Sequence, residues 1–263
     1  QLEINTIDIY TKYSNDLSGE IYYYNNIPKN VKDMFPIMFD YDTDKNTWYK
    51  IENIKGLTCS TLYNSELLTK TTLHAIMSSL VRLQNLNLNV EHDAEINIYK
   101  NYCEKIELRY NSYDYSRFKE CEKTYNEIYT FLKNYEDKQQ GKKVIIHGDP
   151  VLTNIMINEF DKIKFIDMRG KVGDTLTLYG DWLYDWAKLY QSLIGYDAIL
   201  MEKSISSKYR NEMLSAFEEY FMSKFTRNDF INMKMITKSL LLTLIPMHNN
   251  EKCQKYYNLI SSI

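Results

Sequence analysis

The segment from Val144 to Asp167 constrains the fold most, because it combines a short strand, an irregular loop and a β-hairpin. Residues 144–146 form an apolar run of strand length, and a loop containing Gly and Pro follows it. Residues 154–158 and 162–167 alternate in polarity on either side of a polar turn, which is typical of a hairpin. A compact β-structure is therefore expected in the middle of the chain.

Helical periodicity surrounds this β-structure. Apolar residues recur at helical spacing from Ser65 onwards, and the stretches before Gly141 lack Pro and Gly. After Gly180 the same periodicity returns. The predicted helices cover 65–86, 96–112, 116–137, 181–194, 207–225 and 228–262, and we expect the last to break at Pro246.

The beginning of the chain favours extended structure. Alternating polarity over 2–12 predicts a strand, and residues 20–25 predict a short helix. Residues 46–54 predict a second strand, which we expect Gly56 to close. The chain is thus predicted to have a small strand-containing N-terminal lobe and a mostly helical C-terminal lobe that carries the hairpin, an α+β arrangement.

Charge and composition exclude several classes of partner. The 32 basic and 35 acidic residues nearly balance, which provides no basic surface for nucleic acid or for a membrane. No apolar run approaches the roughly 20 residues of a transmembrane helix, and no signal peptide is recognisable. The four cysteines lack paired spacing. We expect a soluble cytoplasmic protein with reduced thiols, and neither a nucleic-acid nor a membrane partner.

The hairpin predicts that three polar side chains meet. Antiparallel pairing places Asn154 opposite Ile166 and Asp167, and the loop with Asp149 leads directly into the first strand. Carboxylate and amide oxygens are the ligands that Mg²⁺ prefers. In phosphoryl transfer, one carboxylate orients the attacking hydroxyl and accepts its proton, while an Asn and an Asp hold the metal. Each residue singly could be an ordinary loop residue, but together they predict a phosphotransferase.

The motifs HGDPVLTN, FIDMRG and GDWLYDWAKL resemble the aminoglycoside phosphotransferase and choline kinase family, which shares the protein-kinase-like fold. The resemblance implies a nucleotide-binding N-lobe and hinge over 1–56, and a helical C-lobe over 57–263 with the catalytic loop and the acceptor site. It implies Asp149 as the catalytic base. It also implies Asn154 and Asp167 as Mg²⁺ ligands.

The same resemblance implies residues that support the loop. Asp185, in the helix after the hairpin, is implied to accept backbone hydrogen bonds from the loop. Asp181 lies one turn earlier on the same helix face and is expected to help. His147 could act as a general base, but the resemblance favours a structural role that braces the loop.

Two further residues are candidates for contact with phosphate or acceptor. Arg169 follows Asp167 by two residues, and a salt bridge to a neighbouring carboxylate is its alternative role. Trp182, together with Tyr184 and Trp186, could form an aromatic wall for a cationic acceptor. Ordinary packing in the core is the alternative for these three rings, and it is the more common role of aromatic residues on a helix.

The N-terminal lobe resembles the family's nucleotide site. Lys12 and Glu20 resemble the strand lysine and helix glutamate that hold the α- and β-phosphates, and Glu52 and Ile54 resemble the hinge that receives the base of ATP or GTP. No glycine-rich loop precedes Lys12. Because the chain begins with Gln rather than Met, we expect either that those strands, and a further domain, precede it or that a reduced lobe holds the triphosphate.

The acceptor is a hydroxyl-bearing small molecule whose class stays open. The family accepts amino alcohols such as choline or ethanolamine, sugars, and aminoglycoside antibiotics. We favour a sugar or amino alcohol of bacterial surface-polysaccharide biosynthesis, because the tail LLLTLIPMHNNEKCQKYYNLI resembles such members. Glu91, Asp93 and Glu95 could attract an amine, although a solvated loop is the simpler interpretation. A catalytically weak nucleotide-binding domain of a larger protein is the alternative from another class.

Overall fold

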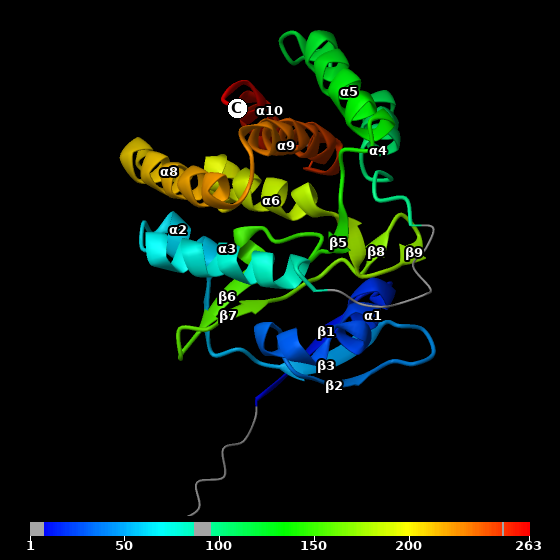
Figure 1. Ribbon diagram of the computed structural model, residues 1–263, viewed down its shortest axis with the longest axis vertical. Helices are drawn as coiled ribbons and strands as arrows, with labels where there is room; N and C mark the ends of the chain where they lie inside the picture. Colours follow the sequence, from blue (N-terminus) through cyan, green and yellow to red (C-terminus); the bar gives the residue numbers. More distant parts are fainter. Residues whose placement is uncertain (1–7, 87–95, 249) are drawn as a thin grey trace, which may run out of the picture.

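The computed structural model describes residues 8–86, 96–248 and 250–263, and it begins with a three-stranded antiparallel sheet (Figure 1). The strands pair in the order β1 (Ile9–Tyr13), β3 (Trp48–Glu52) and β2 (Met38–Tyr41). The two predicted strands are present as β1 and β3, and residues 2–7 of the first prediction lie outside the described residues. The strand β2 is an addition, because its short and partly exposed sequence has little apolar periodicity.

The predicted short helix is present as α1 (Ser18–Asn26), and a 3₁₀ helix (Lys29–Met34) follows it. The helix covers the sheet, with the buried ring of Tyr24 5.7 Å from that of Tyr49. Lys12 pairs with Tyr49 in the register of β1 and β3. This arrangement brings the end of β1 and the first turn of α1 to the same side of the sheet.

The first turn of α1 touches the C-terminal part of the chain, main chain against main chain. A Cβ atom added to Gly19 would lie 2.2 Å from the carbonyl oxygen of Arg169, and one added to Gly170 would lie 1.8 Å from the carbonyl oxygen of Gly19. Gly170 also has a φ of +61°, which side chains rarely adopt. Both positions therefore require glycine.

The predicted hairpin is confirmed as β6 (Ile155–Asn158) and β7 (Ile163–Phe165). Gly56 does not merely close a strand, because β4 (Gly56–Thr58) starts there and pairs with β6. The predicted buried strand is β5 (Lys143–Ile145), which pairs with β10 (Tyr179–Asp181). A small ribbon, β8 (Lys171–Val172) with β9 (Thr175–Leu176), lies between the hairpin and β10 in sequence. These two- and three-residue strands are too short to show a periodicity.

Helices make up most of the rest of the chain, with α6 between the hairpin and α9 in Figure 1. The C-terminal helices are α2 (Cys59–Asn64), α3 (Lys70–Gln84), α4 (Cys103–Asn111), α5 (Cys121–Asp137), α6 (Trp182–Gln191), α7 (Asp197–Leu200), α8 (Ser207–Lys224), α9 (Arg227–His248) and α10 (Lys252–Ser261). A single 3₁₀ turn (Leu152–Asn154) precedes β6, and a π-helical turn (Ser192–Tyr196) follows α6.

Several helix ends differ from the prediction for local reasons. The helix α3 starts at Lys70 because the hydroxyl of Thr69 caps it, accepting a hydrogen bond from the Thr72 N–H at 3.1 Å. The helix α5 starts at Cys121 rather than at the predicted residue 116, because Glu120 adopts a left-handed conformation. The last predicted helix is divided into α9 and α10, but α9 continues through Pro246 and ends at His248, so the break lies later than predicted. Proline removes the bond to the Leu242 carbonyl, and Tyr115 replaces it by donating to that oxygen at 2.8 Å.

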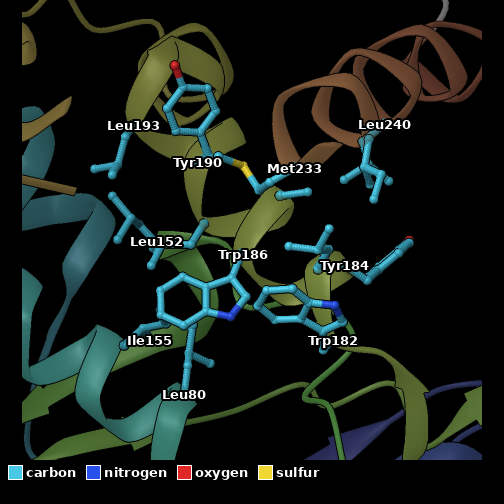
Figure 2. Packing of buried hydrophobic residues seen from close by; sticks show 14 of the residues in the cluster. Leu80, Leu152, Ile155, Trp182, Tyr184, Trp186, Tyr190, Leu193, Met233 and Leu240 are labelled. Atoms are coloured by element: carbon cyan, nitrogen blue, oxygen red, sulfur yellow. The ribbon is translucent and has the colours of Figure 1, made fainter. Parts of the chain in front are cut away.

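The core is centred on α6, which packs against α9 (Figure 2). Trp186 is fully buried, and its ring lies 5.3 Å from that of Phe225 and 5.4 Å from that of Phe221. Among the described residues, α9 alone is long and apolar enough to cross a membrane, but 67% of its apolar stretch is buried inside the protein. That degree of burial is typical of a helix in a protein core.

Candidate active site

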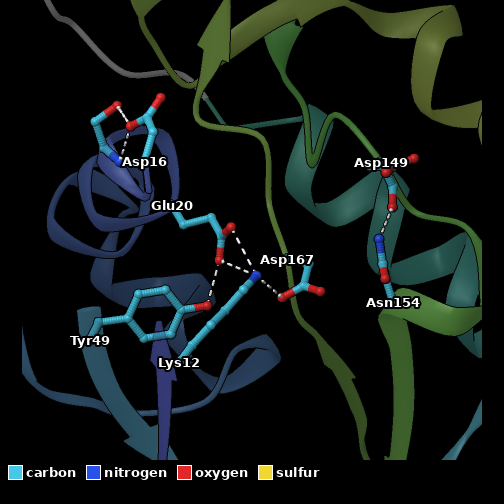
Figure 3. Close-up of polar contacts among 8 residues, drawn as sticks. Lys12, Asp16, Glu20, Tyr49, Asp149, Asn154 and Asp167 are labelled. Carbon is cyan, nitrogen blue, oxygen red and sulfur yellow. Dashed lines mark hydrogen bonds and ion pairs between the residues drawn. The ribbon is translucent and has the colours of Figure 1, made fainter. Parts of the chain in front are cut away.

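A lysine on the N-terminal sheet joins two acidic residues from different parts of the chain (Figure 3). The Lys12 ammonium donates to both carboxylate oxygens of Glu20, at 3.0 and 2.9 Å, and to Oδ1 of Asp167 at 2.8 Å. The Tyr49 hydroxyl also donates to Glu20. Burial alone would lower the pKa of Lys12, but Asp167 and Glu20 together raise it above its usual value. Lys12 is therefore a cation at neutral pH.

The hairpin holds Asp167 at a defined distance from Asn154. The N–H of Ile166 donates to the carbonyl oxygen of Asn154 at 3.0 Å, so the predicted pairing of these two residues is present. Asp167, the next residue, has a φ of +57°, a left-handed conformation that is uncommon for a residue with a side chain. This backbone turn gives its carboxylate a direction that a continued strand would not.

The loop that carries Asp149 is closed by backbone and side-chain hydrogen bonds. The Nδ2 atom of Asn154 donates to the carbonyl oxygen of Asp149 at 3.0 Å, and the N–H of Val151 donates to the same oxygen at 2.9 Å. The amide oxygen of Asn154 remains an acceptor. In Figure 3 the Asp167 carboxylate is drawn between Lys12 and the pair Asp149–Asn154.

A lysine that the sequence analysis missed contacts the Asp149 carboxylate. The ammonium of Lys188, from α6, lies 3.0 Å from Oδ1 of Asp149. Burial would raise the pKa of Asp149, but Lys188 and Arg169 outweigh burial and hold it below its usual value. Lys188 follows Asp185 by three residues and so shares its helix face, and that spacing was the only signal in the sequence.

Asp185 and His147 support the loop that carries Asp149 by accepting hydrogen bonds from its backbone. The Asp185 carboxylate accepts the N–H groups of His147 at 2.7 Å and of Gly148 at 2.8 Å. The N–H of Asp149 donates to Nδ1 of His147 at 3.1 Å. Burial lowers the pKa of His147 to about 4, so its imidazole is neutral at pH 7. These bonds give the loop a single conformation without any contribution from a ligand.

Asp181 and Trp182 lie away from this loop. Asp181 accepts hydrogen bonds from the Tyr102 hydroxyl at 2.5 Å, the Tyr135 hydroxyl at 3.0 Å and the Lys142 N–H at 3.1 Å. It therefore links α5 and the residue before α4 to the residue before β5, and not the loop that carries Asp149. Trp182 is 3% exposed and lies in the core, its ring 4.7 Å from that of Phe225. Because the Trp182 ring is buried against the end of α8, it is not available for the acceptor contact that the sequence left open.

Arg169 lies close to the loop and contacts a tyrosine rather than a carboxylate. Its Nη1 atom donates to the Tyr184 hydroxyl at 2.9 Å, and its guanidinium carbon lies 5.0 Å from the centre of the Tyr184 ring. Lys105, on α4, interacts with the same hydroxyl. The salt bridge considered for Arg169 from the sequence is therefore replaced by a cation–π contact and a hydrogen bond.

A cavity of about 230 Å³ opens between the N-terminal sheet and the hairpin. Lys12, Glu52 and Ile54 line it from the first part of the chain, and Met156, Ile166 and Asp167 line it from the hairpin. Its far wall is aromatic and aliphatic, and one end carries the charged group of Lys12 and Asp167. Four residues that the sequence analysis assigned to nucleotide and metal binding thus border one cavity.

The side-chain oxygen atoms of Asn154 and Asp167 are of the kind that bind a hard divalent cation. Asn154 presents an amide oxygen, and Asp167 presents a carboxylate whose side chain is 43% exposed. Within the described ranges, no group of three or more His, Cys, Asp or Glu residues forms a metal site. An amide oxygen and a carboxylate oxygen are among the ligands that Mg²⁺ accepts, with water and phosphate oxygens completing its coordination.

Comparison with solved structures identifies the architecture. A choline/ethanolamine kinase family protein from Mesorhizobium loti has a TM-score of 0.65 at 10% identity, over 97% of this chain and 82% of that one. A choline kinase from Streptococcus pneumoniae has a TM-score of 0.59 at 13% identity, over 98% and 88%. The chain has the protein-kinase-like fold of choline kinases. This fold confirms the predicted α+β class and the predicted family resemblance.

The same fold includes aminoglycoside phosphotransferases. One from Streptomyces rimosus, solved with ADP and streptomycin, has a TM-score of 0.54 at 12% identity, over 87% of this chain and 86% of that one. No family model and no curated protein matches the sequence. The choline kinase and aminoglycoside phosphotransferase fold is thus retained here at an identity where only the architecture is comparable.

Proposed function

We propose that this chain is a Mg²⁺-dependent phosphotransferase that moves the γ-phosphoryl group of a nucleoside triphosphate to a hydroxyl of a small molecule. One observation carries the proposal. The end of the hairpin brings Asp167 to Lys12, and Asn154, directly before the first strand of the hairpin, closes the Asp149 loop. The loop and the hairpin thus connect a donor-binding cation, two oxygen ligands and a carboxylate base, which is the set of groups that phosphoryl transfer uses.

The nucleotide is proposed to bind between the region 1–56 and the region 57–263. The cavity of about 230 Å³ would receive the base of ATP or GTP, with the backbone at Glu52 and Ile54 as its hydrogen-bonding edge. Lys12 points towards the opposite end and would neutralise charge on the phosphates, held there by Glu20. The relatives solved with AMP and with ADP support a nucleotide donor.

Asp149 is proposed to orient the acceptor hydroxyl and to accept its proton. Its side chain is 35% exposed, so an acceptor can reach it, and Lys188 keeps it ionised. A carboxylate that is ionised at neutral pH can take up a proton as the hydroxyl oxygen attacks phosphorus. Asp185 and His147 maintain the position of the loop through the backbone, so they act on catalysis only through Asp149.

Mg²⁺, when bound, would neutralise the phosphate oxygens and align the triphosphate for in-line attack. Asn154 and Asp167 are the residues that would hold it. For Asp167 this requires the ammonium of Lys12 to share or yield one carboxylate oxygen. A small-molecule kinase of this kind belongs in the cytoplasm, where nucleoside triphosphates are available, and surface-polysaccharide precursors are one class of hydroxyl acceptor that it would meet there.

The test is nucleoside diphosphate release from ATP and GTP, with and without Mg²⁺, over a panel of hydroxyl compounds. Release that rises above the no-acceptor background with at least one compound, and that requires Mg²⁺, is the expected result. The Asp149→Asn variant is the control, because it removes the proposed base while leaving the cavity intact. Nucleotide binding is measured in parallel by calorimetry, so that an inactive but nucleotide-binding protein is recognised.

Two outcomes would contradict the proposal. If no nucleotide binds, the assignment of Lys12 and the cavity is wrong. If nucleotide binds but no acceptor raises release above background, the chain is a nucleotide-binding domain rather than a kinase.

A further inference from the structure

Three cationic side chains from three different segments converge beside Asp149. Lys188 comes from α6 and lies 3.0 Å from the Asp149 carboxylate. Arg169 follows the hairpin and donates to the Tyr184 hydroxyl at 2.9 Å. Lys105 comes from α4 and interacts with the same hydroxyl. We call Lys105, Arg169 and Lys188 the cationic cluster.

The cationic cluster is not neutralised by the acids that face it. Asp149 faces Lys188, and behind the loop the Asp185 carboxylate is already engaged by two backbone N–H groups. Burial would raise the pKa of Tyr184, yet the three cations lower it below its usual value, which reports a positive potential at its hydroxyl. The cations face one ionised carboxylate, Asp149, and two acids that are only partly ionised at neutral pH, because the pKa of Tyr184 is lowered to about 7 and burial raises the pKa of Asp185 to about 7. Positive charge is therefore in excess beside Asp149.

Nucleotide binding does not account for this excess of positive charge, because the lysine proposed to bind the phosphates is Lys12. In Figure 3, Asp167 is drawn between Lys12 and Asp149. The cluster also disfavours a cationic acceptor. The Tyr184 ring, which a quaternary ammonium could stack on, is covered by the Arg169 guanidinium at 5.0 Å. Trp182 is buried in the core. A choline or aminoglycoside next to Asp149 would therefore meet positive charge and no open aromatic face.

The cluster is partly exposed to solvent. The side chains of Lys188 and Asp149 are 16% and 35% exposed, so this pair borders solvent rather than the core. Lys105 and Arg169 are half-buried, which removes part of their hydration. Partly desolvated cations form strong hydrogen bonds with carboxylate or phosphate oxygens.

We propose that the acceptor carries an anionic group, a carboxylate or a phosphate ester, close to its reactive hydroxyl, and that Lys105 and Arg169 bind this group while Lys188 positions Asp149. This inference rests on the proposed phosphotransferase function and specifies its substrate class. It replaces the amino alcohol as the favoured acceptor by a hydroxy acid or a sugar acid, or by a sugar phosphate.

The test uses acceptors that share one carbon skeleton and differ in charge. The first set is glycerol, D-glycerate, glycerol 3-phosphate and 3-amino-1,2-propanediol, and the second is glucose, glucuronate, glucose 1-phosphate and glucosamine, with choline added. We expect an anionic member to exceed its neutral counterpart in kcat/KM by about 10-fold to 100-fold, the effect of one or two charge-assisted hydrogen bonds. The carboxylate and phosphate members distinguish the two sources of the anion.

Lys105→Met is the diagnostic variant, because Lys105 interacts with Tyr184 rather than with Asp149. It should raise KM for the anionic acceptor about 10-fold with kcat and the KM for nucleotide nearly unchanged. The matched control is Lys208→Met, an exposed lysine on α8. The same variants are also tested for stabilisation by inorganic phosphate in thermal unfolding. We expect Lys105→Met to lose part of this stabilisation and Lys208→Met to retain it.

The outcomes separate the two proposals. If choline, glucosamine or the aminodiol is the best acceptor in its set, the anionic class is wrong and the phosphotransferase stands. If phosphate stabilises wild type and Lys105→Met equally, the cluster does not bind anions. Failure of every acceptor, together with nucleotide binding, contradicts the phosphotransferase itself, and the phosphate measurement still decides whether the cluster binds an anion.

Discussion

The Nζ atom of Lys12 lies 2.8 Å from Oδ1 of Asp167, although 155 residues separate them in the sequence. The same ammonium binds Glu20, so one cation joins a strand and a helix of the N-terminal part to the end of the hairpin. An ammonium with three donors can bind phosphate oxygens while keeping part of these contacts. Several consequences can be measured.

Replacing Lys12 by Met should weaken nucleotide binding by about 10-fold to 100-fold, because the proposed phosphate contact is lost and the carboxylates of Glu20 and Asp167 lose the cation between them. Calorimetric titration with ATP and Mg²⁺ gives the dissociation constant. Lys50→Met is the matched control, since Lys50 is on the neighbouring strand and pairs only with exposed Asp40 and Trp48. Equal affinities for the two variants would contradict the assignment of Lys12.

Replacing Asp149 by Asn should lower turnover by about a hundredfold to ten-thousandfold, the usual contribution of a general base. Nucleotide affinity should change little, because the proposed contacts of the donor are with Lys12 and the cavity. Steady-state kinetics and a parallel binding titration measure the two effects. Asp174→Asn, at an exposed turn, serves as control. Near-normal turnover in Asp149→Asn would remove Asp149 from the chemistry.

Replacing Lys188 by Met should move the acidic limb of the pH–rate profile to higher pH. Lys188 is one of two cations that hold the pKa of Asp149 below its usual value, so its loss raises that pKa, and a higher pH is then needed to ionise the base. The dependence of kcat/KM on pH reports the shift. Lys188→Arg keeps the charge and should restore most of the wild-type profile, whereas an unchanged profile in Lys188→Met would show that the ion pair does not set the ionisation.

Replacing Asp185 by Ala should lower the free energy of unfolding by about 2–5 kcal/mol, because two buried N–H groups lose their acceptor. Urea denaturation followed by tryptophan fluorescence measures the change. Turnover should fall as well, since the loop that carries Asp149 loses its support. A variant as stable as wild type would mean that water or another acceptor replaces the carboxylate.

Asp185 should also contribute to the pH dependence of stability. Burial raises its pKa in the folded protein to about 7, from the usual 3.8, so between these values the folded state holds a proton that the unfolded state has released. Its contribution to stability is therefore complete below about pH 4 and falls as the pH rises to about 7. Unfolding curves of wild type and Asp185→Asn over this range should differ in slope, and parallel curves would contradict the raised pKa.

The sequence allowed the hairpin and the loop to be predicted, because period-two alternation on both sides of a polar turn defines the register around Asn154 and Ile166. It did not allow Lys188 to be found, because a lysine on a helix is usually solvated and its contact with Asp149 depends on tertiary packing. For Trp182 the sequence left both an acceptor contact and core packing open, and its burial is in line with packing, since a helix near the site has both a site-facing and a core-facing side. The turn of Asp167 into a left-handed conformation also has no local signal.

The main-chain contact between Gly19 and Gly170 sets the distance between the two segments that carry Glu20 and Asp167. Gly19 immediately precedes Glu20, and Gly170 follows Asp167 by three residues. A single methyl group at either glycine would act as a wedge between these two segments, since it would lie within 2.2 Å of a carbonyl oxygen. The distance between Glu20 and Asp167 that the Lys12 ammonium bridges thus depends on the absence of two side chains, and a methyl group at either glycine would force the two segments apart.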